Sequence, residues 1–268
     1  MPDPAGTPRS FDAAPIEVAP ALPRPALPGT VIVRASEDEW LDAVAADLVL
    51  HAKNCVRTFG DFHLALSGGK TPEPLYRRLM YDPLCRDFPW KRTHLWVVDE
   101  RRVPMDDDRC NFKMIHETVV AHSDIPKDQV HPIRALEPDA DDLYEAELRE
   151  SLAWREKGHD RLDFVLLGMG SDGHTASLFP RSPALDARGR LVVINDGPAV
   201  TPPDRVTMTF DLINAARFVA VLVSGPSKRD TIARVVRHTD PVHDLPILGV
   251  RPVGGELRWY LDLAACPT

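Results

Sequence analysis

The fold of this chain is decided by the stretch Leu64-Ala65-Leu66-Ser67-Gly68-Gly69-Lys70-Thr71-Pro72. A short apolar run is followed at once by small and polar residues, and then by a proline, which suits the first turn of a helix. This order is typical of a buried parallel strand that leads into a helix on one face of a sheet. Residues 67–72 therefore lie at the carboxyl end of the strand, where ligands bind in such sheets.

Three further apolar runs, each followed by a loop rich in Gly, Ser, Asp or Arg, predict parallel strands at 95–98, 164–167 and 218–223. Helical spacing occurs between the runs, at 72–80, 111–121, 141–157 and 227–238. The alternation predicts an α/β fold: a doubly wound, mostly parallel, Rossmann-like sheet with helices on both faces.

The pattern starts near residue 30. Residues 31–33 predict a strand, and residues 37–58 predict a helix through the spacing of Trp40, Val44 and Leu48. Residues 191–194, 205–210 and 257–261 predict a few extra strands, whose order the sequence does not give.

The first 28 residues differ from the rest because they contain eight prolines and almost no periodic apolar pattern. Such a segment buries too little surface to offset the cost of ordering it. We therefore expect a flexible proline-rich tail over residues 1–28 and a single α/β domain over residues 29–268.

Composition restricts the partners. Lys and Arg total 32 against 40 for Asp and Glu, and the net charge of -8 disfavours nucleic acid or an anionic membrane. The four cysteines form no C-x-x-C pair, no apolar run is long enough to span a bilayer, and no secretory signal is present. These features predict a cytoplasmic protein that acts on a small molecule. We expect a monomer or a small homo-oligomer, a choice that the sequence does not decide.

The loop at 67–71 is the first candidate site. Ser67, Gly68, Gly69 and Lys70 follow the strand, and Thr71 is expected to cap the helix, so that free backbone N–H groups face an anion. The spacing differs from that of a nucleotide P-loop, which favours a small phosphorylated ligand over ATP. An ordinary strand-to-helix turn is the alternative.

A second loop places carboxylates beside guanidinium groups. Asp99, Glu100, Arg101 and Arg102 follow the run 95–98, and Asn111 comes shortly after them. Such residues can position sugar hydroxyls and a phosphate or a developing oxyanion. The alternative is a solvated charge cluster.

The third loop contains Gly168, Gly170 and Gly173 at the spacing of a dinucleotide-binding fingerprint. That match is rejected, because Pro180 follows too soon for the long helix that the fingerprint requires. What remains is a turn that presents Asp172 and His174. Histidine can take a proton from water near neutral pH, and a neighbouring carboxylate can orient its ring.

A fourth loop, 224–228, precedes a predicted helix and carries Lys228, which is placed to close over a phosphate together with Arg205. Either residue can equally be a surface cation. No metal site is expected, because His116, His122 and His131 lack ligand spacing.

Taken together, these loops resemble the glucosamine-6-phosphate isomerase/6-phosphogluconolactonase family, and its 6-phosphogluconolactonases in particular. The resemblance covers about residues 30–262 and depends on residues 66–72, on Asp99-Glu100-Arg101 with Val103-Pro104 and Asn111, on residues 172–180, and on residues 205–209.

The resemblance implies the fold of glucosamine-6-phosphate deaminases and ribose-5-phosphate isomerases. It also implies hydrolysis of 6-phospho-D-glucono-1,5-lactone in the oxidative pentose phosphate pathway, without a metal or organic cofactor. The expected catalytic residues are His174 as general base, Asp172 and Arg101. The expected substrate-binding residues are Ser67, Gly68, Gly69, Lys70, Thr71, Asp99, Glu100, Asn111, Gly170, Gly173, Arg205 and Lys228.

Two alternatives stay open. An aminosugar-phosphate deaminase or isomerase has similar loops but usually carries a glutamate where this chain has Phe179. A phosphosugar-sensing regulator requires a DNA-binding helix-turn-helix, which the proline-rich residues 1–28 and the negative charge disfavour.

Overall fold

The structure is a computed structural model that describes residues 22–153, 155–195 and 204–267. Within these residues, seven strands form one parallel sheet in the order β1-β10-β9-β6-β2-β3-β5. They are β1 (Thr30–Arg34), β2 (Phe62–Leu66), β3 (Thr93–Val97), β5 (Val130–His131), β6 (Phe164–Gly168), β9 (Phe218–Val223) and β10 (Glu256–Asp262). A small antiparallel sheet has the order β4-β8-β7, with β4 (Asp99–Arg101), β8 (Arg205–Met208) and β7 (Val192–Asn195).

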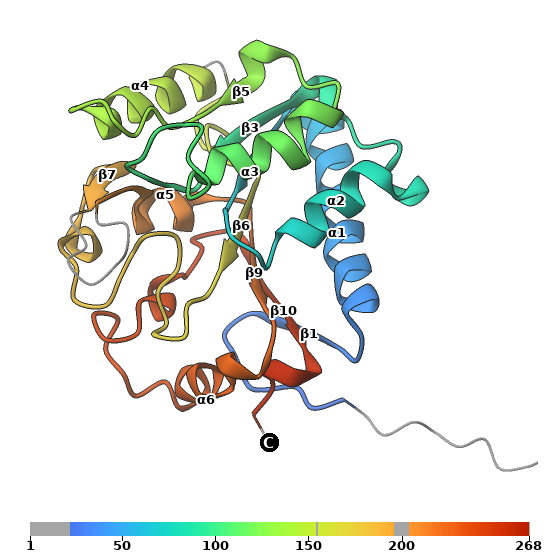
Figure 1. Cartoon of the computed structure of the whole chain (residues 1–268), viewed down its shortest axis with the longest axis vertical. Helices are drawn as coiled ribbons and strands as arrows, with labels where there is room; N and C mark the ends of the chain where they lie inside the picture. The colour runs from blue at the N-terminus through green and yellow to red at the C-terminus, as the bar shows by residue number, and fades with distance from the viewer. Residues whose placement is uncertain (1–21, 154, 196–203, 268) are drawn as a thin grey trace, which may run out of the picture.

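The helices cover both sides of the parallel sheet. They are α1 (Glu37–Phe59), α2 (Glu73–Tyr81), α3 (Asn111–Thr118), α4 (Ala140–Leu152), α5 (Phe210–Ala215) and α6 (Arg229–Arg237). In Figure 1, α1 and α2 lie to the right of the sheet, and α5 lies to its left beside β7. The predicted doubly wound α/β fold, with extra strands, is confirmed.

The order of the strands contains a switch point. From β2 the chain adds β3 and β5 on one side, and from β6 it adds β9 and β10 on the other. Because β2 and β6 are neighbours, the loops that follow them leave the sheet in opposite directions. A crevice at such a point is the usual binding site of a doubly wound sheet.

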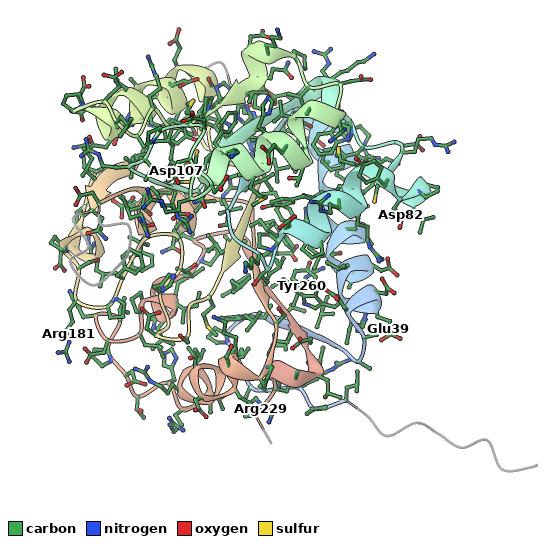
Figure 2. All side chains as sticks on the ribbon, in the orientation of Figure 1. Glu39, Asp82, Asp107, Arg181, Arg229 and Tyr260 are labelled. Carbon is green, nitrogen blue, oxygen red and sulfur yellow. The ribbon has the colours of Figure 1, made fainter. Side chains whose placement is uncertain are left out.

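The core lies between the helices and the sheet. Every residue of β2 and of β9 is buried, as their continuous apolar sequences predict. Large side chains such as Trp40, Trp96 and Tyr260 are almost completely buried. A fully buried Leu or Phe side chain, such as Leu64 or Phe62, stabilises the fold by about 1.5–3 kcal/mol. Figure 2 shows Tyr260 in the interior, whereas Glu39 and Arg181 lie at the periphery.

Helix α1 illustrates how local sequence sets the boundaries. The Ser36 side chain accepts a hydrogen bond from the Glu39 backbone N–H at the start, and Gly60 ends the helix in the left-handed conformation with φ +92°. The predicted range of 37–58 is therefore confirmed to within a residue.

Other boundaries differ from the prediction. The helix expected to reach residue 157 ends at Leu152, and the strand expected to reach residue 210 ends at Met208. There the Thr209 side chain accepts from the Leu212 N–H and starts α5, which the sequence analysis missed. The short strands β4 and β5 were also missed, because they are too brief to show a period.

Most of the segment expected as a tail, residues 1–21, lies outside the described residues. Residues 22–28 are described: Leu27 is buried against the core, and the Pro28 carbonyl accepts a hydrogen bond of 2.8 Å from Trp259 Nε1. The division at residue 28 stays a prediction, and these contacts favour a domain that starts a few residues earlier. None of the helices in the described ranges is long and apolar enough to cross a membrane.

Candidate active site

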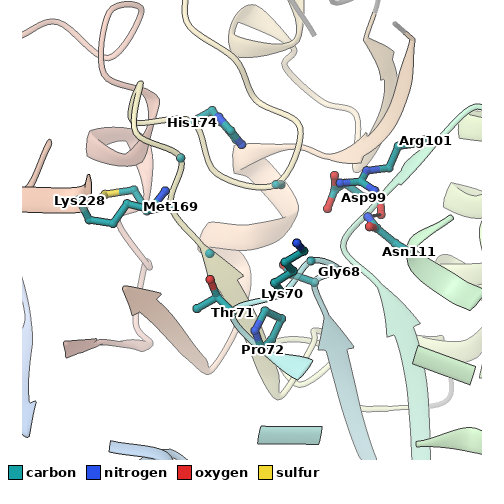
Figure 3. A pocket seen from close by; sticks show the side chains of 15 residues that line it. Gly68, Lys70, Thr71, Pro72, Asp99, Arg101, Asn111, Met169, His174 and Lys228 are labelled. Carbon is teal, nitrogen blue, oxygen red and sulfur yellow. Dashed lines mark hydrogen bonds between the residues drawn. The ribbon is translucent and has the colours of Figure 1, made fainter. Parts of the chain in front are cut away.

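A cavity of about 240 Å³ opens at the switch point, beside the carboxyl ends of β2 and β6 (Figure 3). It brings together residues from all four predicted loops. The residues that line it are Ser67, Gly68, Gly69, Lys70, Thr71, Pro72, Asp99, Arg101, Asn111, Gly168, Met169, Gly170, His174, Ala176 and Lys228.

The His174 ring, about a third exposed, projects toward this cavity and pairs with Asp172. The distance from His174 Nδ1 to Asp172 Oδ1 is 2.6 Å, and the same oxygen accepts the His174 backbone N–H at 3.1 Å. Burial raises the pKa of Asp172, but the hydrogen bonds and charge of His174 outweigh it and the pKa is lowered overall. Asp172 is therefore an ionised acceptor at neutral pH.

The pair determines which histidine nitrogen can act as a base. A carboxylate can only accept hydrogen bonds, so His174 Nδ1 carries the proton that faces Asp172. In the neutral ring the lone pair then lies on Nε2. This is the tautomer that a general base needs, and the predicted pairing of Asp172 with His174 is confirmed.

The close approach of the pair depends on a glycine. A Cβ atom built on Gly170 lies 2.2 Å from His174 Nδ1 and 2.5 Å from Asp172 Oδ1, so a larger residue forces the pair to move. The Gly170 N–H also donates to the His174 carbonyl at 2.8 Å, which closes the loop on itself.

Contacts from distant segments hold the loop. The Gly173 carbonyl accepts the Ile247 N–H at 2.9 Å, and Ser177 Oγ donates to Asp99 Oδ2 at 2.5 Å. Between these anchors Ala176 lines the cavity with a φ of +50°, a strained conformation of the kind found at functional sites. Gly173 itself is not among the lining residues, so its predicted substrate contact is replaced by a role in the turn.

The second loop is a strand, and this changes the roles of its residues. Side chains alternate across β4, and Asp99 and Arg101 line the cavity, whereas Glu100 does not. Arg102 also points away, because its guanidinium donates to the carbonyls of Ala135 and Glu137. Of the two arginines, Arg101 is therefore the one at the site.

Glu100 is buried at the N-terminus of α3. Its carboxylate accepts backbone N–H groups from Arg101, Asn111 and Phe112 at 2.7–2.8 Å. Burial raises its pKa, and these hydrogen bonds only partly oppose the shift. The prediction that Glu100 binds substrate is corrected: it holds β4 against α3, because alternation directs it away from the cavity.

The first loop lines the cavity with its backbone. Ser67 Oγ donates to the Leu166 carbonyl at 2.7 Å, so the hydroxyl is used inside the protein. A Cβ atom on Gly68 lies only 1.9 Å from Asn111 Oδ1, which means that a glycine is needed for α3 to approach. The prediction that Thr71 caps α2 is wrong, because Pro72 already has helical dihedral angles and occupies the cap position without a side-chain hydrogen bond.

Three cations, Lys70, Arg101 and Lys228, and one carboxylate, Asp99, line the cavity. Figure 3 shows Lys228 and Arg101 on opposite sides and Lys70 between them. Burial lowers the pKa of Lys228, and the charge of Asp172 partly opposes that shift. The site thus attracts an anion although the whole chain is negative.

Arg205 lies deeper than predicted. It is buried on β8, opposite Arg101 in the antiparallel register, and its guanidinium carbon lies 6.0 Å from the centre of the Phe179 ring. The Phe179 ring in turn lies 4.7 Å from the His174 ring. Arg205 is not among the lining residues, and its contact with substrate stays a prediction.

Several residues that line or support the cavity were missed by the sequence analysis. Gly168, Met169, Pro72 and Ala176 line the cavity, and Ser177 holds Asp99. All of them stand inside the recognised motifs, so their position carried a signal, but the sequence did not show which side chains point inward.

A second group of titratable side chains, Asp61, His63 and His94, has the spacing of metal ligands. The sequence analysis did not connect these residues. Trp96 Nε1 can only donate, and it faces His63 Nδ1 at 3.0 Å, so the His63 proton lies on Nε2 and points to Asp61 at 3.1 Å. The lone pair of His63 that a metal ion would need is therefore on Nδ1, where it already accepts the hydrogen bond from Trp96 Nε1.

Comparison with known proteins shows which protein family this chain resembles in sequence and structure. A model of the family described as glucosamine-6-phosphate isomerases/6-phosphogluconolactonase matches residues 35–259. The chain is 39% identical to a 6-phosphogluconolactonase of Mycobacterium tuberculosis, with 87% of this chain and 92% of that protein covered. It is 40% identical to the human GDH/6PGL endoplasmic bifunctional protein over 87% of this chain.

The chain spans only 30% of the length of the human protein. Among solved structures, a 6-phosphogluconolactonase from Thermotoga maritima has a TM-score of 0.74 and 30% identity, with 87% of this chain and 100% of that chain covered. These similarities extend over both halves of the sheet and all four loops of the cavity. The chain belongs to the glucosamine-6-phosphate isomerase/6-phosphogluconolactonase family.

Proposed function

We propose that this chain hydrolyses 6-phospho-D-glucono-1,5-lactone to 6-phospho-D-gluconate, as a carboxylic ester hydrolase of the oxidative pentose phosphate pathway. The observation that carries the proposal is the pair His174–Asp172, with Nδ1 and Oδ1 2.6 Å apart, beside a cavity that three cations line. The names of the 6-phosphogluconolactonase relatives support this substrate.

The base is His174 Nε2. It takes a proton from a water molecule while the water oxygen bonds to C1 of the lactone. The tetrahedral intermediate then collapses, the bond from C1 to the ring oxygen breaks, and protonated His174 returns the proton to that oxygen. Asp172 stabilises the imidazolium and keeps the ring in the required tautomer.

The remaining lining residues bind and orient the substrate. Lys228, Lys70 and the backbone of the first loop would hold the 6-phosphate, as cations and glycine-rich turns do. Arg101, which donates to the Arg109 carbonyl at 2.5 Å, would stabilise the oxyanion. Asp99 and Asn111 would bind hydroxyl groups. A lactone is an activated ester, so these groups suffice without a metal or organic cofactor.

Phe179 separates this proposal from its nearest rival. Deaminase chemistry on this fold usually uses a carboxylate at that position for proton transfer, and here a buried phenyl ring lies 4.7 Å from His174. His174 is then the proton carrier of the loop, which favours hydrolysis over amine chemistry.

The test is hydrolysis of freshly prepared 6-phosphogluconolactone, with the spontaneous rate subtracted, in parallel with ammonia release from glucosamine 6-phosphate. We expect lactone hydrolysis without ammonia release. We also expect His174→Ala to lower kcat by about 100-fold or more while inorganic phosphate still binds. Absence of catalysed lactone hydrolysis would sink the proposal, and a nearly normal rate in His174→Ala would remove His174 from the role of base.

We retain two further predictions, namely a cytoplasmic location and a monomer or small homo-oligomer. The location is supported by Cys55, Cys85, Cys110 and Cys266, which are all unpaired and buried. Size-exclusion chromatography with light scattering tests the oligomeric state.

A further inference from the structure

The loop after β6 carries Asp172 and His174 and is called the catalytic loop here. Its tip is exposed, yet the geometry of the tip determines how the proposed base is held. Ser171 and Asp172 are exposed, and Asp172 Oδ1 must remain 2.6 Å from His174 Nδ1 for the base to keep its tautomer. An exposed loop tip moves unless other segments hold it. The contacts of Ser171 therefore bear directly on the pair.

One of these contacts comes from helix α6. Thr231 is 2% exposed in the first turn of α6, and its Oγ1 donates to the Ser171 carbonyl at 2.6 Å. A threonine within a helix commonly bonds a carbonyl of its own helix. Here the hydroxyl is directed to another segment, and the residue that it holds immediately precedes Asp172.

The same helix is connected to the anion-binding side of the cavity. Lys228 ends the short turn Pro226–Lys228, three residues before Thr231, and it lines the cavity. His174, the partner of Asp172, lines the same cavity, and the charge of Asp172 partly opposes the burial that lowers the pKa of Lys228. Thr231 thus follows a cation that lines the cavity by three residues, and it holds the residue that precedes the carboxylate of the His174 pair.

We infer that Thr231 is a positioning residue: its hydroxyl fixes Ser171 and so connects the Lys228 end of the cavity to the Asp172–His174 pair. The inference rests on the proposed function for its catalytic consequence. A ligand phosphate held by Lys228 and the start of α6 also steadies the catalytic loop, because the two are joined by this hydrogen bond.

The test is Thr231→Val, which keeps the shape of the side chain and removes the hydroxyl. We expect kcat to fall about tenfold, because a base displaced by a fraction of an ångström reacts more slowly, while KM changes by less than about threefold. Thr231→Ser restores the donor and should recover kcat to within about threefold of the wild type.

The matched control is Thr93→Val. Thr93 is also buried, and its Oγ1 donates to the Pro89 carbonyl at 3.0 Å, at the opposite edge of the sheet from the cavity. This variant loses a comparable hydrogen bond, and we expect it to keep kcat.

A carbon-13 NMR titration of the Asp172 carboxyl group provides a second readout that general destabilisation does not move. In Thr231→Val the pKa of Asp172 should rise toward 3.8, its ordinary value, because the hydrogen bond from His174 that lowers it is weakened. Thr231→Ser should leave it low.

Wild-type kcat with an unchanged Asp172 titration in Thr231→Val would overturn the inference. So would an equal loss in Thr231→Ser, since the methyl group and not the hydroxyl would then matter. If the wild type hydrolyses no lactone, the proposed function fails, but the Asp172 titration still decides whether Thr231 positions the loop.

Discussion

In the proposed mechanism, the position of one proton on His174 decides which ring nitrogen acts as the base. Because Asp172 accepts at Nδ1, the lone pair that would take a proton from water lies on the opposite nitrogen, Nε2. Because the His174 ring is about a third exposed and also lines the cavity, it can contact both solvent water and a ligand in the cavity. Asp172 is not among the residues that line the cavity, so in this mechanism its carboxylate would act on the reaction through the ring.

Asp172→Asn tests this directly. The amide is neutral, does not stabilise the imidazolium, and can donate to Nδ1, which selects the wrong tautomer. We expect kcat to fall by about 100-fold or more with KM nearly unchanged, measured by steady-state lactone hydrolysis. An unchanged kcat would show that the ring needs no carboxylate.

Glu100→Gln is the matched control, because Glu100 is also a carboxylate in the motif but holds three backbone N–H groups. A glutamine offers one acceptor where two oxygens were used. We expect the free energy of unfolding in urea to fall by about 1–3 kcal/mol while most of kcat is kept. A loss confined to substrate binding would instead restore the original prediction for Glu100.

At the scale of elements, strands with long apolar runs could be predicted from the sequence, whereas the shortest strands could not. The apolar runs of β2, β6 and β9 predicted the parallel sheet, and the loops after them predicted the position of the cavity. Residues 99–101 contain no apolar period, so the sequence did not reveal that they form a strand. The alternation that separates Asp99 and Arg101 from Glu100 followed only from the pairing of β4 with β8.

The loop after β6 leads to a prediction at this scale. In Gly170→Ala the new methyl group meets the His174 ring and the Asp172 carboxylate, so the loop must open. We expect kcat to fall at least tenfold with a small change in melting temperature, since both neighbours are partly exposed.

Gly255→Ala serves as its control. Its added Cβ lies 2.2 Å from the Ala216 carbonyl oxygen, next to the amino-terminal end of β10 and away from the cavity. This variant should lose stability and keep kcat. Equal effects of the two variants on kcat would argue against a specific role for Gly170.

Across the whole molecule, the carboxyl ends and the amino ends of the parallel strands carry different features. The carboxyl edge carries the cavity, where two halves of the sheet diverge between β2 and β6. The opposite side holds a buried polar network in which Arg155 bridges Asp61 and Asp163. The sequence predicted the cavity because its loops are motifs, but it did not predict the polar network, since Arg155 and Asp61 are 94 positions apart.

Two histidines beside Asp61 of this network, His63 and His94, should make the stability of the protein depend on pH. Burial, followed by the charges of His63 and His131, lowers the pKa of His94 from 6.5 to about 4, and burial lowers the pKa of His63 as well. Between pH 6.5 and about 4 the unfolded chain binds a proton that the folded chain does not, so stability is lost as the pH falls. For His94 alone the loss is about 3 kcal/mol.

Urea denaturation at pH 7.0, 6.0, 5.0 and 4.5 measures this loss. In His94→Asn an amide replaces Nδ1, which faces His131 Nε2 at 3.0 Å, and the titrating group is removed. The fall in unfolding free energy between pH 7.0 and 4.5 should then be smaller by about 2 kcal/mol than in the wild type. Asp61, whose lowered pKa takes effect only below 3.8, contributes little in this window. Identical pH dependence in the two proteins would show that His94 is protonated in the folded state as readily as in the unfolded chain.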